Sequence, residues 1–206
     1  MDISFIFQIL ILILSVVVHE VSHGYAALML GDVTAKYAGR LTLNPVKHLD
    51  PFGSVILPLI LSLIPGGLIF GWAKPVPYNP HNLRNKRWGE ALVAAAGPAS
   101  NLIIAGVFGL LIRYSQVLDL GKSFVDLALV VVFINIVLAI FNLMPIPPLD
   151  GSKILFSFFP KHTQNLRVSF ERYGLVFLLI FIFFVWQYLT PAIIFMAEIF
   201  TGLSLI

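Results

Sequence analysis

The chain has 206 residues, of which 59% are hydrophobic, 11% are charged and none is cysteine. Soluble domains are typically about 25% charged, and the 23 charged side chains here (13 Lys and Arg plus 10 Asp and Glu) cannot cover so apolar a chain in water. The composition excludes a soluble enzyme, a disordered chain and a nucleic-acid-binding module. It predicts an integral membrane protein with a single domain over residues 1–206.

The first apolar stretch predicts a transmembrane helix over about residues 3–30. Residues 3–18 carry no charged side chain, and the apolar pattern resumes as far as Leu30. At 1.5 Å per residue, such a helix reaches about 42 Å, which exceeds the bilayer core of about 30 Å. A cleavable signal peptide is the alternative, but it needs a basic start and a small-residue cleavage site, and neither follows Met1-Asp2.

Three later apolar runs predict further transmembrane helices, over about residues 90–112, 124–143 and 174–189. The last run stays uncharged beyond residue 189, but Thr190-Pro191 interrupts it, and proline disfavours a helix interior. Residues 191–206 are therefore predicted to form a broken or interfacial helix.

The apolar stretch over residues 52–70 contains proline and glycine helix breakers and is predicted as a re-entrant hairpin. If it spans the membrane, the 13 Lys and Arg residues divide 8 to 5 between the two sides. If it returns to the same side, they divide 11 to 2, with only Arg113 and Lys122 outside. The positive-inside rule favours the second arrangement. It puts the N-terminus outside and residues 31–89 and 144–172 in the cytoplasm.

The pattern His19-Glu20-Val21-Ser22-His23 in the first predicted helix indicates a metal site. Helix residues four apart share a face and lie about 6 Å apart along the axis, so both imidazoles can reach one metal ion. Glu20 lies beside them, within reach of a water molecule at that metal. Ionisable groups inside a bilayer are costly and are candidates for a functional site. The alternative is a pair of histidines hydrogen-bonded to neighbouring helices.

A catalytic zinc ion usually has three protein ligands, so a third must come from another segment, and without cysteine it must be His, Asp or Glu. Asp150 is the only acidic residue between Asp126 and Glu171, and it follows a proline-rich exit from the predicted helix 124–143. In the predicted topology, Asp150 and His19–His23 lie toward the same side of the membrane. Asp150 is therefore the predicted third ligand, with a helix-capping or loop carboxylate as the alternative.

Three motifs together make the sequence resemble the site-2 protease family of intramembrane zinc metalloproteases. They are His19-Glu-Val-Ser-His23, then Gly97-Pro-Ala-Ser-Asn101, which is expected to open another helix, and Asn142-x-x-Pro-x-Pro-x-Leu-Asp150-Gly151. Asn44–Pro51 and Gly71–Pro77 further resemble the compact prokaryotic branch of that family, the type without PDZ or CBS domains. The motif-bearing region covers roughly residues 15–155.

The resemblance implies a zinc endopeptidase that hydrolyses peptide bonds in or near the transmembrane segments of membrane-protein substrates. It implies one Zn2+ per chain, with His19, His23 and Asp150 as ligands and Glu20 as the catalytic base. Asn142 carries over as a candidate contact to the substrate or the transition state. The expected setting is the lipid bilayer of a prokaryotic cell membrane, with the active site near the cytoplasmic side. No nucleic acid is expected as a partner, and the sequence does not fix the oligomeric state.

The substrate has to be an extended peptide, because a transmembrane helix hides its carbonyls in internal hydrogen bonds. Addition to a sheet edge would hold such a peptide open, and Arg40–Leu43 and Trp72–Tyr78 are the candidate edges; ordinary cytoplasmic loops are the alternative. Pro75 and Pro77 confine the second segment to an edge because they cannot donate to a ladder. The expected fold class is an all-α polytopic membrane protein with about four transmembrane helices, a re-entrant hairpin and short edge strands near the active site.

Several polar residues have plainer interpretations. Gly97–Asn101 also fits a proline-bearing first turn and small-residue helix packing. His48 and Asp50 are expected to make turn contacts, with an auxiliary role at the site as the alternative. Asn135 either bonds neighbouring helices together or belongs to a water path.

Two other functions compete with proteolysis. One is a metal or ion carrier that uses His19, His23 and Asp150 as a transit site, and the other is a non-catalytic relative that binds membrane segments. Glu20 argues against the carrier, because transport does not require a base beside the ligands. Replacing Glu20 with Gln separates these functions, since only a protease loses turnover while keeping zinc.

Overall fold

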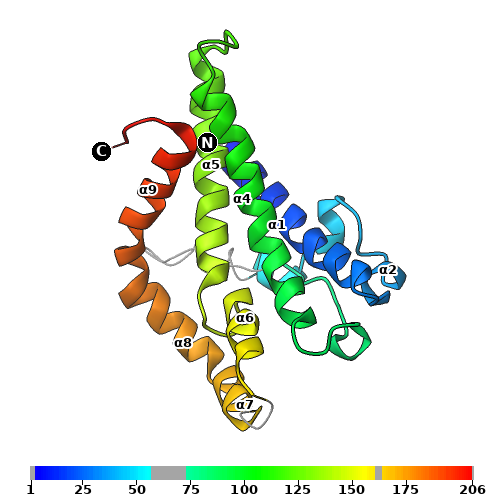
Figure 1. Cartoon of the computed structure of the whole chain (residues 1–206). Coiled ribbons are helices and arrows are strands. Elements are labelled where there is room, and N and C mark those ends of the chain that lie inside the picture. The colour runs from blue at the N-terminus through cyan, green and yellow to red at the C-terminus, as the bar shows by residue number, and fades with distance from the viewer. Residues whose placement is uncertain (1–2, 57–72, 161–163, 206) are drawn as a thin grey trace.

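The structure is a computed structural model that describes residues 3–56, 73–160 and 164–205 (Figure 1). The elements in chain order are α1 (Ile3–Met29), α2 (Thr34–Tyr37), η1 (Pro45–His48), η2 (Pro51–Ile56), η3 (Pro80–Asn82), α4 (Gly89–Arg113), α5 (Lys122–Leu143), α6 (Asp150–Phe158), α7 (Gln164–Arg172), α8 (Gly174–Ile180), η5 (Phe181–Val185), η6 (Trp186–Leu189) and α9 (Thr190–Thr201). In the described residues the regular structure is helical.

Four helical stretches of the described chain are long and apolar enough to cross a membrane. They are Phe5–Met29, Gly89–Arg113, Lys122–Leu143 and Gly174–Thr201. Each coincides with one of the apolar runs of the sequence, so the prediction of an all-α polytopic membrane protein with about four transmembrane helices is confirmed.

The antiparallel hairpin of α4 and α5 forms the centre of the molecule, and α9 packs against both helices (Figure 1). Their shared core contains Ala105 and Ile112 from α4, Ala128, Val132 and Ile136 from α5, and Ile193 and Ala197 from α9. Small residues let the helices approach closely, as is common in membrane bundles. At Gly109 of α4, an added Cβ would lie 2.8 Å from the Cβ of Phe200 in α9.

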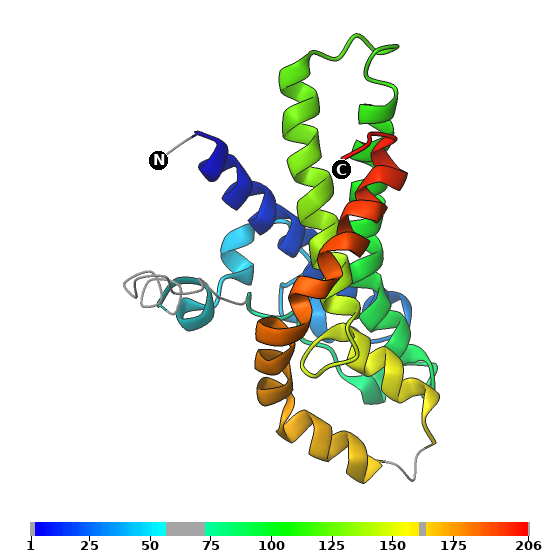
Figure 2. The ribbon, with the colours of Figure 1, turned by 90° about the vertical axis from the view of Figure 1, so that its left-hand side faces the viewer.

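Helix α1 crosses α4 obliquely, and α6 lies against the same half of α4 (Figures 1 and 2). Ser15, His19 and His23 are spaced by four residues on α1, so they share one face of that helix. All three are buried, whereas apolar residues elsewhere on α1, such as Phe5 and Leu10, are exposed as expected for a lipid-facing surface. The crossing therefore brings the polar face of α1 against the lower half of α4, where α6 begins.

The last span remains helical where the sequence predicts a break. The α-helical geometry of α8 gives way to a π-helical turn in η5 and a 3-10 turn in η6 before α9 begins at Thr190. Pro191 lies in the first turn of α9, where its missing N–H leaves no helical hydrogen bond unmade. The change of geometry therefore falls over Phe181–Leu189, and the helix continues to Thr201.

The predicted span over residues 90–112 matches α4, but the expectation that the motif Gly97–Asn101 opens a helix is wrong. Gly97–Asn101 lies in the middle of α4, eight residues after its first residue Gly89, and Pro98 is inside the helix. A proline within a transmembrane helix is tolerated when neighbouring helices support the freed backbone groups. Within this motif Gly97 and Asn101 are buried and lie against α1, whereas Ala99 is exposed.

The predicted edge strands are not found in the described residues, and most of the predicted re-entrant hairpin lies outside them. In the described residues, Arg40–Leu43 and residues 73–78 are non-helical segments that form no β-strand. Pro75 and Pro77 carry no N–H, so a continuous ladder cannot form along the second segment. Residues 57–72, which include most of the predicted re-entrant hairpin 52–70 and Trp72, lie outside the described residues.

Candidate metal centre

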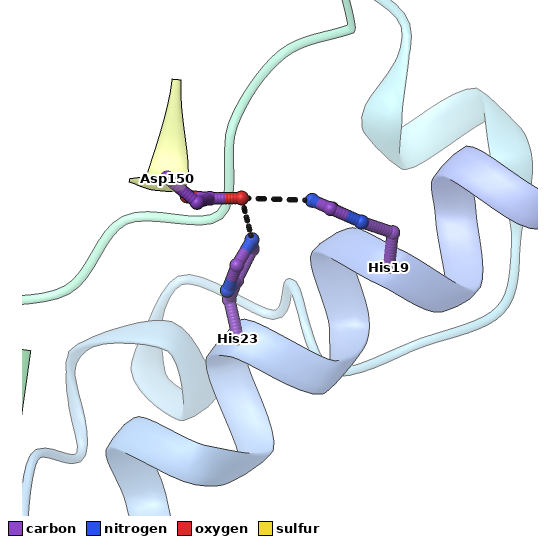
Figure 3. A group of neighbouring side chains, drawn as sticks. All are labelled: His19, His23 and Asp150. Carbon is purple, nitrogen blue, oxygen red and sulfur yellow. Dashed lines mark hydrogen bonds and ion pairs between the residues drawn. The ribbon is translucent and has the colours of Figure 1, made fainter. Parts of the chain in front are cut away.

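Three buried side chains from two helices converge on one point (Figure 3). The Nε2 atoms of His19 and His23 each lie 3.1 Å from Oδ2 of Asp150. The three ligand atoms all lie within 4.8 Å of one another. Donor atoms around a tetrahedral zinc ion, each bound at about 2.0–2.1 Å, lie about 3.3 Å from one another. The spacing of this cluster therefore suits a zinc ion.

The hydrogen bonds on the far side of each imidazole fix which nitrogen carries the proton. His23 Nδ1 lies 2.7 Å from the carbonyl oxygen of Val93, which can only accept, so Nδ1 donates. His19 Nδ1 lies 2.6 Å from Asn101 Oδ1, and the Asn101 amide is oriented because its Nδ2 donates to Asn135 Oδ1 at 2.8 Å. In the neutral imidazoles both Nε2 lone pairs then face the Asp150 carboxylate. A cation is needed between these three acceptors, which fits a metal ion.

Glycine at two positions lets the segments approach this closely. A Cβ built on Gly97 would lie 2.5 Å from the Nε2 atoms of both His19 and His23. A Cβ built on Gly151 would collide with the backbone of Leu143 at the end of α5. Gly97 thus leaves room for the imidazoles against α4, and Gly151 lets the first turn of α6 carry Asp150 to them.

Lys153 lies one turn after Asp150 and holds its other oxygen. Its Nζ is 3.3 Å from Asp150 Oδ1. Burial acts to raise the pKa of Asp150, whereas the positive charge of Lys153 acts to lower it. Burial acts to lower the pKa of Lys153, and the Asp150 carboxylate raises it above its ordinary value. Both groups are therefore charged, as a carboxylate ligand and its neighbouring ammonium require.

Glu20, next to His19 in the chain, is half-buried and engages a different segment. Its Oε2 accepts a hydrogen bond of 2.8 Å from the backbone N–H of Val76. The carboxylate is thereby held on the side of α1 next to residues 74–78, the segment expected to receive a peptide.

The other predicted residues form hydrogen bonds with groups outside these three side chains. Asn142 donates its Nδ2 to the carbonyl of Leu138 in its own helix, at 2.9 Å. His48 Nε2 bonds the carbonyl of Thr42, and Asp50 Oδ1 accepts from the backbone at the start of η2, so both make the turn contacts expected of them. Asn135 bonds residues of α1 and α4, which favours the interhelical role.

Three residues at the site were missed by sequence reasoning or given a plainer role: Asn101, Lys153 and Val76. Asn101 was recognised only as part of the motif Gly97–Asn101, for which helix packing was the plainer interpretation. Val76 acts through its backbone N–H, which leaves no signal in a side chain. Lys153 follows Asp150 at a spacing of three, and helical spacing could have found it once α6 was recognised.

A helical His-Glu-x-x-His pattern combined with a third ligand from another segment is the arrangement of a zinc metallopeptidase, and here it lies within a membrane-spanning bundle. Sequence comparison specifies the family: the chain belongs to peptidase family M50, the site-2 protease family, whose profile matches residues 7–128 and 113–185. It is accordingly a zinc metalloendopeptidase with Zn2+ as its cofactor.

Two relatives illustrate the similarity. The protein named "Putative zinc metalloprotease YwhC" from Bacillus subtilis (strain 168) is 39% identical over 183 residues, which cover 85% of this chain and 80% of the relative. The protein named "Putative zinc metalloprotease Rip2" from Mycolicibacterium smegmatis (strain ATCC 700084 / mc(2)155) is 29% identical over 88% of this chain, and the match covers 66% of its own length. No solved structure matches the chain.

Proposed function

We propose that this enzyme cleaves peptide bonds in or near the transmembrane segments of membrane-protein substrates. In this proposal His19, His23 and Asp150 hold the zinc ion, and Glu20 is the catalytic base. The observation that carries the proposal is the position of the two histidines within the apolar span Phe5–Met29. A peptide that reaches them has to enter the membrane-spanning bundle, and a soluble substrate has no reason to do so.

Zinc, Glu20 and Asn142 have separate roles in the proposed hydrolysis. Bound zinc supplies a Lewis acid that polarises the scissile carbonyl and lowers the pKa of a water molecule. Glu20 takes a proton from the attacking water and delivers it to the leaving amine nitrogen as the C–N bond breaks. Its Oε2 is engaged by Val76, so Oε1 is the oxygen that exchanges the proton. Asn142 remains the proposed contact to the transition state; one N–H of its amide donates to the carbonyl of Leu138, and the amide has a second N–H.

The proposed topology has the N-terminus outside and the metal centre near the cytoplasmic face of a prokaryotic cell membrane. It is supported by the positive-inside rule: with residues 52–70 as a re-entrant hairpin, the Lys and Arg residues divide 11 to 2 in favour of the cytoplasmic side. The chain has no cysteine, so single cysteines can report sidedness without background. Gln116→Cys, between α4 and α5, should react with an impermeant maleimide in intact cells. Lys47→Cys should react only after permeabilisation, and the reverse pattern would contradict the topology.

The test of the function measures zinc and cleavage in the same samples. Wild type, Glu20→Gln, Asp150→Ala and the exposed control Asp126→Ala are purified and incubated with a single-span membrane protein. We expect one zinc per chain in all except Asp150→Ala, and cleavage only by wild type and the control. Zinc retained by Asp150→Ala would contradict its role as a ligand. Cleavage by Glu20→Gln would contradict its role as the base, and no cleavage by any sample in native membranes would favour a non-catalytic relative.

A further inference from the structure

The peptide bond between Pro75 and Val76 is held from both of its polar sides. On one side, the Arg40 guanidinium donates through Nη2 to the carbonyls of Lys74, at 2.6 Å, and Pro75, at 3.3 Å. On the other side, the Val76 N–H donates to Glu20 Oε2 at 2.8 Å. The Pro75 carbonyl and the Val76 N–H belong to one planar group, so fixing the first fixes the direction of the second.

Arg40 is held in place by burial. Its residue is only 7% exposed, its guanidinium bonds backbone carbonyls, and its Nε has no hydrogen-bond partner in the part of the chain that the structure describes. Burying a charged group with an unpartnered N–H is unfavourable. In the described residues, the Arg40 side chain donates to the Lys74 and Pro75 carbonyls, next to the Val76 N–H that donates to Glu20.

Two further contacts restrict the same segment. Gly24 lies one turn after Glu20 on α1, and a Cβ there would be 2.9 Å from Cγ1 of Val76 and 2.5 Å from Cδ2 of Leu41. The Val76 side chain therefore packs directly on the α1 backbone. The Lys74 N–H donates to the carbonyl of His48 at 2.8 Å. Pro75 has a fixed φ angle, which removes one of the remaining degrees of freedom.

We propose that Arg40 is a positioning residue for Glu20, acting through the Pro75–Val76 peptide bond. The inference rests on the proposed role of Glu20 as the base. With Arg40 in place, the Val76 N–H holds Oε2 and sets the direction of Oε1. Without Arg40, the peptide group can rotate, the carboxylate loses its fixed orientation, and proton transfer slows while zinc and substrate still bind.

The experiment compares Arg40→Met, Arg40→Lys and the matched control Lys47→Met, which removes an exposed cation from the nearby turn η1. Removing a group that positions a reacting side chain can lower the rate by up to about 100-fold, and we expect kcat of Arg40→Met to fall about 10- to 100-fold. KM should stay within about twofold and zinc should remain at one per chain, because the Arg40 side chain is buried against the Lys74 and Pro75 carbonyls and is not a metal ligand. Arg40→Lys retains one donor and should give an intermediate kcat, and Lys47→Met should resemble wild type.

Two measurements separate positioning from a general loss of structure. The first is hydrogen exchange of a peptide that contains residues 74–79. Exchange of this peptide should be faster in Arg40→Met than in wild type. Within this segment Pro75 and Pro77 carry no N–H, so few amides contribute to the signal. The second measurement is the coupling between Arg40 and Glu20. In a Glu20→Asp background, Arg40→Met should lower kcat much less than it does in wild type, because both changes disturb the same carboxylate.

The outcomes distinguish this inference from the proposed function. Wild-type kcat and unchanged exchange in Arg40→Met, with Glu20→Gln inactive, overturn the role of Arg40 alone. The role of Arg40 is also overturned if Arg40→Met lowers kcat as much in the Glu20→Asp background as in wild type, or if its lower kcat is accompanied by loss of zinc. Cleavage by Glu20→Gln overturns the proposed function itself, and the positioning role with it.

Discussion

The Nδ1 atom of His19 lies 2.6 Å from Oδ1 of Asn101, across the interface between α1 and α4. Asn101 is completely buried and is itself oriented by Asn135 of α5, whose Nδ2 donates to Ser15 Oγ at 3.0 Å. Three helices thus share one polar network behind the metal centre. Because each amide is satisfied in only one orientation, the network fixes the His19 tautomer that directs Nε2 toward Asp150.

The first prediction concerns Asn101. Asn101→Leu removes the acceptor for His19 Nδ1, so the imidazole is free to place its proton on Nε2 and to rotate. Loss of such an outer partner typically weakens metal binding about 10- to 100-fold, and we expect that decrease in zinc affinity by titration against a competing chelator. Asn101→Asp retains an acceptor and should lose less. Equal zinc affinity in Asn101→Leu and wild type would show that the network does not control the ligand.

The second prediction uses two glycines of the same helix. In Gly97→Ala the new methyl group occupies space 2.5 Å from both ligand nitrogens, so the imidazoles must move away from each other or from Asp150. We expect loss of most bound zinc and of cleavage, measured by metal content and proteolysis. Gly106→Ala is the control, because a Cβ at Gly106 meets nothing within 4 Å. Similar losses in both variants would indicate a general effect on α4 instead of a local one.

Much of the centre follows from the sequence. His19 and His23 were predicted from their helical spacing, and Asp150 from the topology, because an apolar bundle restricts where the few acidic residues can go. The structure brings these three together. The four membrane-spanning helices could also be predicted from the sequence, since hydrophobicity over about 20 residues is a strong signal.

The parts of the site that could not be predicted from the sequence depend on long-range contacts. Pro98 suggested a helix start, but it lies inside α4, so Asn101 is at mid-helix beside His19. The segment with Pro75 and Pro77 was a candidate edge strand because these prolines cannot donate to a ladder, but Arg40 and Glu20 bond it through their side chains. Backbone donors such as the Val76 N–H are present at nearly every residue, so sequence alone cannot select the one that meets Glu20.

The third prediction concerns Asp32, a buried carboxylate that joins the end of α1 to the segment carrying η3. It accepts from the N–H and hydroxyl of Thr34, from Asn82 Nδ2 at 2.9 Å and from the Asn79 N–H at 2.7 Å. Burial acts to raise the pKa of Asp32, but these hydrogen bonds outweigh it and hold that pKa below its ordinary value. Asp32→Asn can accept at one oxygen only, and we expect a loss of about 2 kcal/mol in stability at pH 7.

The sign of the pH dependence follows from the lowered pKa. Because the unfolded chain takes up a proton at a higher pH than the folded one, the stabilisation is complete above the ordinary Asp value of about 3.9 and is lost as the pH falls through the folded pKa. The difference in melting temperature between wild type and Asp32→Asn should therefore shrink below about pH 4. Asp126→Asn, at an exposed position, should show no difference at either pH. A gap that widens on acidification would contradict a charged Asp32.

The last prediction is that zinc stabilises the fold through the three convergent ligands. Without the ion, two Nε2 lone pairs and a carboxylate oxygen face one another in a buried space, which is unfavourable unless additional protons are bound. A ligand at 100 times its Kd adds about 2.7 kcal/mol to the stability of the folded state, so chelation should lower the melting temperature of the wild type by several degrees and added Zn2+ should restore it. Asp150→Ala should melt at the same temperature with and without the chelator. Glu20→Gln should respond to the chelator as the wild type does, because its side chain is not a ligand. If the response disappeared in Glu20→Gln and persisted in Asp150→Ala, Glu20 would be the ligand and Asp150 would not.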